Sequence, residues 1–337
     1  MKQTRRQFCG GLAAGSVLAS TVGVRSAHAQ AAAQGAAQAG AYPNRPIKLI
    51  VPYGAGSATD VQGRLILPKM SEVLGQPVLV ENRPGATGVI GAEMVARSAP
   101  DGYTLMIGTN ATHATMQSLT KLPYVVMRDF SFIGRLSSTP AFVIVNNDVP
   151  AKTLPEFIAW AKTQPQGVVF GSTGNGGSGH LSSELIGMKT GIKLIHVPYK
   201  DGGQAVTDLM SGQIKMMSYF ASILPHVRAG RLRALAVLAD KRSPSAPDLP
   251  TAAEQGLPGL EVAAWAGMFG PAGIPQPIVN RLWGALEAAL NDSTLREQFA
   301  KQGVEPLPLG LEPFRQYCEA EATRWAEVIR TAGLKLD

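Results

Sequence analysis

Residues 47–60 read IKLIVPYGAGSATD, and this stretch decides the fold class. The run from Ile47 to Tyr53 is apolar and rich in β-branched side chains, which predicts a buried strand. The strand ends at Gly54-Ala55-Gly56, and from Asp60 to Leu74 apolar residues recur at helical spacing. A strand, a glycine-containing loop and a helix in this order form the building unit of an α/β protein.

The same order of strand and helix repeats along the chain. Further strands are predicted at residues 77–81, 103–108, 142–145, 168–171, 194–198 and 232–238. Helices are predicted at 89–97, at 154–163, from 180 onward and at 204–210, and the chain from Pro277 is predicted to be largely helical. This alternation favours parallel sheets that are covered by helices.

Two long segments, residues 133–146 and 262–270, separate the repeating blocks and are predicted to cross between two α/β lobes. The last helices then return to the first lobe. We therefore expect lobe 1 to consist of residues 42–140 and 265–337, and lobe 2 to consist of residues 141–264. A length of 337 residues also suggests about two domains at ~150 residues each.

Composition excludes several classes of protein. Charged residues make up 16% and hydrophobic residues 45%, which excludes a disordered polyelectrolyte and a coiled coil. The net charge of +7 falls to +3 without the four basic residues of the leader described below. The rest of the chain does not cluster Lys and Arg with aromatic residues, so we expect no nucleic-acid partner. Only Cys318 follows the leader, which excludes an intramolecular disulfide.

The N-terminus has the composition of an export signal. A basic segment with Arg5-Arg6 precedes a short apolar run and the triplet Ala27-His28-Ala29, which is typical of a signal peptide. The arginine pair resembles a twin-arginine signal, and a plain Sec signal is the alternative. We expect residues 1–29 to be a signal peptide of the twin-arginine type, cleaved near Ala29, and residues 30–41 to be a flexible lead-in. The predicted location is the periplasm.

Four small, polar, glycine-rich loops follow predicted strands, at residues 54–60, 108–113, 172–179 and 199–204. Ligands of open α/β sheets bind beyond the carboxyl ends of the strands, and helix N-termini present N–H groups that suit an anion. We therefore predict one shared ligand cleft, with hydroxyl donors from Ser57, Thr59 and Ser178. The alternative for each loop is that its Ser, Thr and Asp only cap helices. For Asp60, the role of an acid in the first turn of the helix is favoured over contact with a ligand.

A dinucleotide site is the main competing interpretation. Residues 174–179 read GNGGSG and fit G-x-G-x-x-G, with Asp201 placed 22 residues beyond Gly179. An exported NAD(P)-dependent oxidoreductase would use Gly174, Gly176 and Gly179. The motif lies in the middle of the chain, which disfavours this interpretation. The chain has no G-x-S-x-G, and His113, His180, His196 and His226 lack the spacing of metal ligands, so we expect neither catalysis nor a metal nor a cofactor.

Five segments carry a resemblance to a known family. They are IVPYGAGSATD (50–60), ENRPGA (81–86), APDGY (99–103), HVPYK (196–200) and RAGRLRALAV (228–237). In this order they resemble the substrate-binding proteins of tripartite tricarboxylate transporters, the Bug family, from Tyr42 to Asp337. The resemblance implies a type II-like, two-lobe periplasmic binding fold with a hinged interdomain cleft. It also implies capture of a small carboxylated organic acid and its delivery to a separate membrane permease.

In the family the carboxylates are held mainly by backbone N–H groups, hydroxyls and waters of these loops. The candidate ligand-binding residues are Tyr53, Ala55, Gly56, Ser57, Thr59, Asp60, Thr109, Asn110, Thr112, Asn175, Gly176, Ser178, Tyr199, Gly202, Ser218 and Tyr219. Two segments depart from the family pattern, the first loop at Tyr53 to Gly56 and the segment Ser218-Tyr219-Phe220. Tyr53, Tyr219 and Phe220 could make room for an apolar or aromatic ligand body. We expect a monomer, and a ligand sensor for a membrane signalling partner is a further alternative.

Overall fold

The computed structural model describes residues 42–199 and 202–334. The expected signal peptide, the lead-in, Lys200, Asp201 and the last three residues lie outside the described residues. The first strand and helix are β1 (Ile47–Val51) and α2 (Ala58–Leu74). They are followed by β2 (Val78–Asn82), α3 (Val89–Ala96) and β3 (Thr104–Thr109). The three strands are parallel in the order β2-β1-β3, as the strand and helix pattern predicts.

A second parallel group is formed later in the chain. Its elements are α6 (Leu154–Lys162), β5 (Val168–Ser172), α7 (Ser178–Thr190), β6 (Leu194–Pro198), α8 (Gly202–Ser211), β7 (Met216–Tyr219) and β8 (Leu232–Leu238). Strands β6, β5 and β7 are parallel neighbours. The predicted strands and helices of this region are therefore confirmed, with boundaries that differ by one or two residues at most ends.

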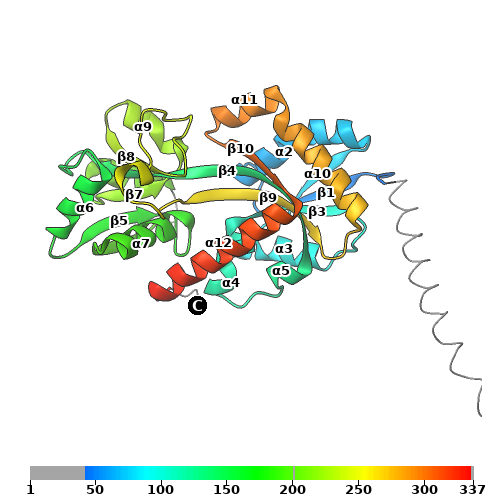
Figure 1. Ribbon diagram of the computed structural model, residues 1–337, viewed down its shortest axis with the longest axis horizontal. Helices are drawn as coiled ribbons and strands as arrows, with labels where there is room; N and C mark the ends of the chain where they lie inside the picture. The colour runs from blue at the N-terminus through cyan, green and yellow to red at the C-terminus, as the bar shows by residue number, and fades with distance from the viewer. Residues whose placement is uncertain (1–41, 200–201, 335–337) are drawn as a thin grey trace, which may run out of the picture. The chain divides into compact units, whose positions relative to one another are not determined.

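Two long antiparallel strands connect the two groups, β4 (Phe130–Asn146) and β9 (Ala263–Pro271) (Figure 1). Residues 130–140 of β4 pair with β9, and residues 141–146 pair with β7 and β8. The predicted parallel pairing does not extend to the crossing segments, because β9 is antiparallel to both β3 and β4. A chain that leaves one group and later returns runs in opposite directions in the two crossings, so the crossing strands pair antiparallel.

The C-terminal region contains α10 (Gln276–Asn291), α11 (Ser293–Lys301), β10 (Glu305–Gly310) and α12 (Leu311–Thr331). Strand β10 was not predicted, because Pro306 and Pro308 argue against a strand. It pairs with β4 alone, and the register shifts between Pro306 and Leu309, as expected for prolines at the edge of a sheet. Helix α10 packs against α2, and α12 packs against β4.

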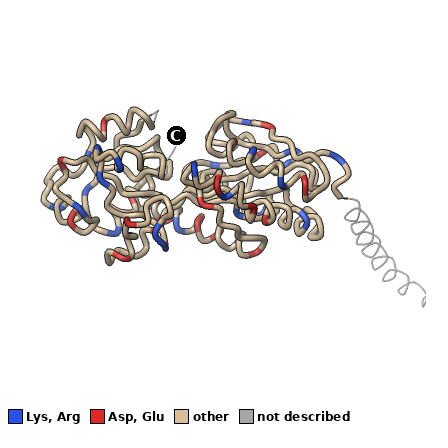
Figure 2. The backbone as a smooth tube through the Cα atoms, turned by 90° about the horizontal axis from the view of Figure 1, so that it is seen from above, with Lys and Arg blue, Asp and Glu red and all other residues tan. Residues whose placement is uncertain are grey.

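Short helices complete the described chain. They are η1 (Ala86–Gly88), the π-helical η2 (Ala111–Thr115), α4 (Met116–Leu119), α5 (Val126–Asp129), η3 (Ala221–Ile223), α9 (Leu224–Arg228) and η4 (Ala253–Gln255). Within the described ranges, each helix is too short or too polar to cross a bilayer. Basic and acidic positions are interspersed along the tube in Figure 2.

Aromatic and aliphatic side chains fill the core on both groups of strands. Met216 and Met217 of β7 are fully buried in this core. Trp283 covers two glycines, and a Cβ atom at Gly134 or Gly310 would overlap with its ring. Trp283 thereby packs against both β4 and β10. Cys318 is buried and has a free thiol.

Candidate functional site

A cavity of about 410 Å³ opens where β1 and β3 end and α2 begins. Its size is in the range of small-molecule sites. Its walls are formed by Tyr53, Ser57, Ala58, Thr59, Gln62, Thr109, Asn110, Ala111, Ser137, Thr139, Phe220, Ala221, Ser222, Ala264, Trp265, Ala266, Gln302 and Val304. Among these described residues none is charged, and seven carry hydroxyl groups.

A slightly larger cavity, of about 450 Å³, is lined instead by charged side chains such as Asp240, Lys241 and Glu261. None of the predicted site residues lines it. The 410 Å³ cavity lies at the carboxyl ends of parallel strands, which is where α/β sheets bind ligands. We therefore take it as the candidate site.

The N-terminus of α2 faces this cavity. Ser57 caps the helix, because its hydroxyl accepts a hydrogen bond from the Asp60 N–H at 3.2 Å. The N–H groups of Ala58 and Thr59 belong to the first helical turn and have no intrahelical partner, and both residues line the cavity. Free N–H groups and the helix dipole together attract an anion.

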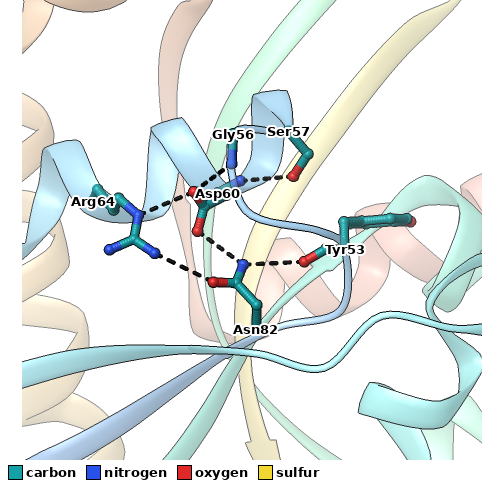
Figure 3. Close-up of polar contacts among 6 residues, drawn as sticks. All are labelled: Tyr53, Gly56, Ser57, Asp60, Arg64 and Asn82. Atoms are coloured by element: carbon teal, nitrogen blue, oxygen red, sulfur yellow. Dashed lines mark hydrogen bonds and ion pairs between the residues drawn. The ribbon is translucent and has the colours of Figure 1, made fainter.

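The carboxylate of Asp60 holds the first loop in shape (Figure 3). It accepts hydrogen bonds from the Gly56 N–H at 2.9 Å, from Arg64 Nε at 3.0 Å and from Asn82 Nδ2 at 2.8 Å. Asn82 Nδ2 also donates to the Tyr53 carbonyl at 3.0 Å. The bond from Arg64 is the largest of the effects that lower the pKa of Asp60 to about 2. Asp60 is buried and its oxygens are occupied, so its contacts are those of a first-turn helix acid.

The second loop follows β3 and forms part of the same wall. The hydroxyl groups of Tyr53 and Thr109 are 2.8 Å apart, and burial raises the pKa of Tyr53. Thr112 Oγ1 accepts a hydrogen bond from the Thr109 N–H at 3.0 Å and lies 2.8 Å from His113 Nδ1. The π-helical turn that contains these residues is a geometry frequent at functional sites. Thr112 therefore shapes the loop from inside.

His113 supports this loop from the core. Its ring is fully buried and stacks on Phe269 with 3.7 Å between ring centroids, and Phe130 contacts it edge-on. Burial lowers the pKa of His113 to about 3. No described group hydrogen-bonds its Nε2 atom. The imidazole is therefore neutral near pH 7 and acts as a packed aromatic ring.

The third loop is held by a pair of histidines. The Gly176 N–H donates to His180 Nδ1 at 3.0 Å, and the His180 ring stacks on His196 with 3.7 Å between centroids. His196 Nε2 lies 2.7 Å from Ser172 Oγ, at the start of the loop. Burial first, and the charge of His180 second, lower the pKa of His196 to about 4. Gly176 has φ +71°, a conformation that glycine adopts without strain.

Five of the predicted residues line the cavity, namely Tyr53, Ser57, Thr59, Thr109 and Asn110. Ser178 is joined to them, because Asn110 Nδ2 donates to Ser178 Oγ at 3.0 Å. The other predicted residues are not among the residues that line it; they are Ala55, Gly56, Asp60, Thr112, Asn175, Gly176, Tyr199, Gly202, Ser218 and Tyr219. Their contact with a ligand stays a prediction.

Several of these outer residues have partners of their own. The Tyr199 hydroxyl donates to Asp208 at 2.8 Å, and burial is the main reason that the pKa of Tyr199 rises to about 12. Ser218 is buried and accepts a hydrogen bond from Ser183 at 3.2 Å. These contacts stabilise the loops that surround the cavity.

The remaining lining residues were missed or only partly anticipated from the sequence. Ser137, Thr139 and Trp265 lie within the crossing strands β4 and β9, whereas the prediction searched the loops at strand ends. A polar triplet at 137–139 inside an otherwise apolar segment was the available signal. Phe220 was expected only as a residue that makes room for a ligand.

Two groups of α/β elements joined by crossing strands, with a polar cavity at the strand ends, form the two-lobe fold of periplasmic solute-binding proteins. Residues 63–334 match the family described as "Tripartite tricarboxylate transporter family receptor", and the chain belongs to this family. The resemblance found in the sequence is thereby confirmed. The family is one of solute-binding receptors, and the dinucleotide and sensor alternatives find no support.

Individual relatives agree with this family over most of the chain. Protein BugT of Bordetella pertussis is 36% identical over 298 residues, which are 88% of this chain and 91% of BugT. The structure of R. palustris Rpa4515 with adipate is 34% identical, has a TM-score of 0.72 and covers 87% of this chain and 99% of its own. MatC from Rhodopseudomonas palustris with bound malate is 33% identical, has a TM-score of 0.68 and covers 86% and 100%.

Proposed function

We propose that this receptor captures a small organic acid in the 410 Å³ cavity and delivers it to a tripartite-type membrane permease. The observation that carries the proposal is the uncharged cavity wall, in which the N-terminus of α2 lies beside hydroxyl and amide groups. A carboxylate held in this way needs no lysine or arginine, because N–H dipoles and hydroxyl donors stabilise its charge. The bound adipate and malate of two related structures support a carboxylate as the ligand class.

The lobes of the proposed receptor are residues 42–140 with 265–337, and residues 141–264. The change of partners along β4 supports this division, since Ala141 is the first of its residues that pairs with β8. Pro140 precedes it and has no N–H to donate. Closure about this point would bring the walls of the cavity together around the ligand.

We expect a carboxylate to stabilise the protein and its amide to fail. A ligand at ~100 times its dissociation constant should raise the free energy of unfolding by about 2.7 kcal/mol. A thermal-shift screen of mono-, di-, hydroxy- and aromatic carboxylates, followed by calorimetry, measures this effect. The neutral amides of the acids that bind are the matched ligands, because they cannot present the same anion. Equal binding of an acid and its amide would contradict the proposal.

Removal of one hydroxyl tests the position of the carboxylate. Thr59→Ala should weaken the acid found in the screen by about 1–3 kcal/mol if the hydroxyl contacts a carboxylate. Thr323→Ala is the matched control, because the Thr323 hydroxyl bonds only the Glu319 carbonyl on α12. An unchanged affinity in Thr59→Ala would place the carboxylate elsewhere.

The proposed receptor acts in the periplasm, and its relatives include structures described as periplasmic binding proteins. Export by the twin-arginine route predicts that Arg5→Lys together with Arg6→Lys traps the precursor in the cytoplasm. Mass spectrometry of the wild-type protein should place the mature N-terminus near Gln30. Normal maturation of the double variant would assign the signal to the Sec route instead.

A further inference from the structure

Gln62 places a buried amide group in the wall of the 410 Å³ cavity. It lies on α2 three residues after Thr59, and side chains at this spacing share one face of a helix. Gln62 is only 7% exposed, so protein surrounds its side chain almost completely. The amide and the first turn of α2 therefore face the same small space.

One half of the Gln62 amide is held by β4, and the other half is free to bind a ligand. Ser137 Oγ donates to Gln62 Oε1 at 2.6 Å, and Ser137 is 1% exposed. Among the described residues, no group accepts a hydrogen bond from Gln62 Nε2. This atom is accessible, unlike the enclosed Nε2 of His113. Because Gln62 lines the cavity, the two N–H donors of its Nε2 point into it.

A β-bulge in β4 turns Ser137 toward Gln62. Side chains two residues apart on a regular strand lie on the same face of the sheet. The Arg135 guanidinium lies 4.7 Å from the centre of the Tyr317 ring on α12, whereas Ser137 bonds Gln62 on α2. The register of β4 against β9 shifts between Arg135 and Ser137, and the extra residue reverses the face. The bulge thus places the Ser137 hydroxyl on the cavity side, where Thr139 also lies.

We propose that Gln62 is a ligand-binding residue that donates from Nε2 to an oxygen of the bound acid, and that Ser137 is a positioning residue that holds this amide in place. This inference rests on the proposed function, since it adds a donor to the same cavity. A buried N–H group that loses water without gaining an acceptor is unfavourable. An oxygen of the ligand is therefore favoured beside Gln62, and an ammonium or alkyl group in the same place is selected against.

Two substitutions of Gln62 test its role by calorimetry on the mature protein, with adipate and malate first and then the other acids of the screen. Gln62→Leu removes the amide and should weaken the tightest-binding acid about tenfold. Gln62→Glu keeps the size of the side chain and an oxygen for Ser137, but it replaces the N–H donors with a negative charge. This variant should weaken the same acid about a hundredfold at pH 7, because like charges then meet in the cavity.

The order of the two effects separates ligand contact from packing. A side chain that only fills space would be harmed more by Gln62→Leu than by the isosteric Gln62→Glu. Gln276→Leu is the matched control and should bind as wild type, because Gln276 is exposed on α10 and its Nε2 donates to Asn280 at 2.9 Å. Wild-type affinity in Gln62→Glu, or the reverse order, overturns the inference and leaves acid binding intact. A wild-type protein that binds no acid of the screen overturns the proposed function itself.

A double-mutant cycle tests the positioning role of Ser137. Ser137→Ala should weaken the acid about fivefold in the wild-type background and should leave the affinity of Gln62→Leu unchanged, because the amide that Ser137 orients is then absent. Circular dichroism and thermal unfolding verify that each variant folds. A loss of affinity by the same factor in both backgrounds would mean that Ser137 acts through the general stability of the wall, and it would overturn the positioning role.

Discussion

Gly108→Ala is expected to destabilise the protein and to disorder the second loop of the site. A Cβ atom at Gly108 would overlap with the His113 ring and would lie 2.7 Å from Phe269. Neither ring can move away, because His113 and Phe269 are fully buried and stacked on each other. Overpacking of this kind costs about 1–3 kcal/mol, and more where the neighbours are rigid. Denaturant unfolding at pH 7 measures the loss of free energy.

Gly284→Ala provides the matched control for Gly108→Ala. Gly284 is an exposed residue inside α10, and a Cβ atom there would meet nothing within 4 Å. Alanine favours the helix over glycine, so this variant should gain roughly 0.5–1 kcal/mol. A Gly108→Ala protein as stable as wild type would show that the stacked rings have room to move.

A shift from pH 7 to pH 5 is expected to lower the free energy of unfolding by about 4 kcal/mol. The pKa of His113 is about 3 and that of His196 about 4 in the folded protein, against 6.5 for an exposed histidine. The unfolded chain therefore binds protons first as the pH falls. The stability that the two neutral rings contribute is complete above pH 6.5 and is lost as the pH falls toward 4 and then 3. Each unit of pH in this window costs about 1.4 kcal/mol per histidine.

His196→Gln separates the two histidines in this experiment. Glutamine can still hydrogen-bond Ser172 but does not titrate, so the variant should lose about half as much stability between pH 7 and pH 5. Asp60 has little influence in this window, because its pKa of about 2 places its loss of stability below pH 3.8. Equal stability of the wild-type protein at both pH values would contradict neutral, buried rings.

The hydrophobic pattern of the sequence predicted the individual strands and helices, but not which distant strands pair with each other. The alternation of apolar strands and amphipathic helices placed β1, β3, β5 and β6 close to their observed ends. The segment now seen as β4 was also expected to cross between lobes. Its antiparallel pairing with β9 depends on residues more than a hundred positions apart, and periodicity carries no information on such partners.

The sequence predicted the site residues that lie in loops at strand ends, but not those that lie within strands. Ser57, Thr59 and Asn110 follow strands and Thr109 ends one, so the strand-end rule found them. Trp265 lies in the middle of β9, where a large aromatic residue is indistinguishable from core in the sequence. Its indole N–H donates to Glu321 on α12, so the ring packs on the α12 side of the strand. Only tertiary structure brings these two residues together.

The chain order of β4 and β9 also has a consequence for folding. Residues 141–264 are continuous, so β5, β6, β7 and β8 can pair as soon as this segment is made. The other sheet needs β9 between β3 and β4, and Phe130 must meet Pro271. The entropy of closing this long loop opposes pairing until the intervening segment is compact. We therefore expect residues 141–264 to fold first. Their compact fold then brings β4 and β9 close together, which lowers the entropy cost of pairing these two strands.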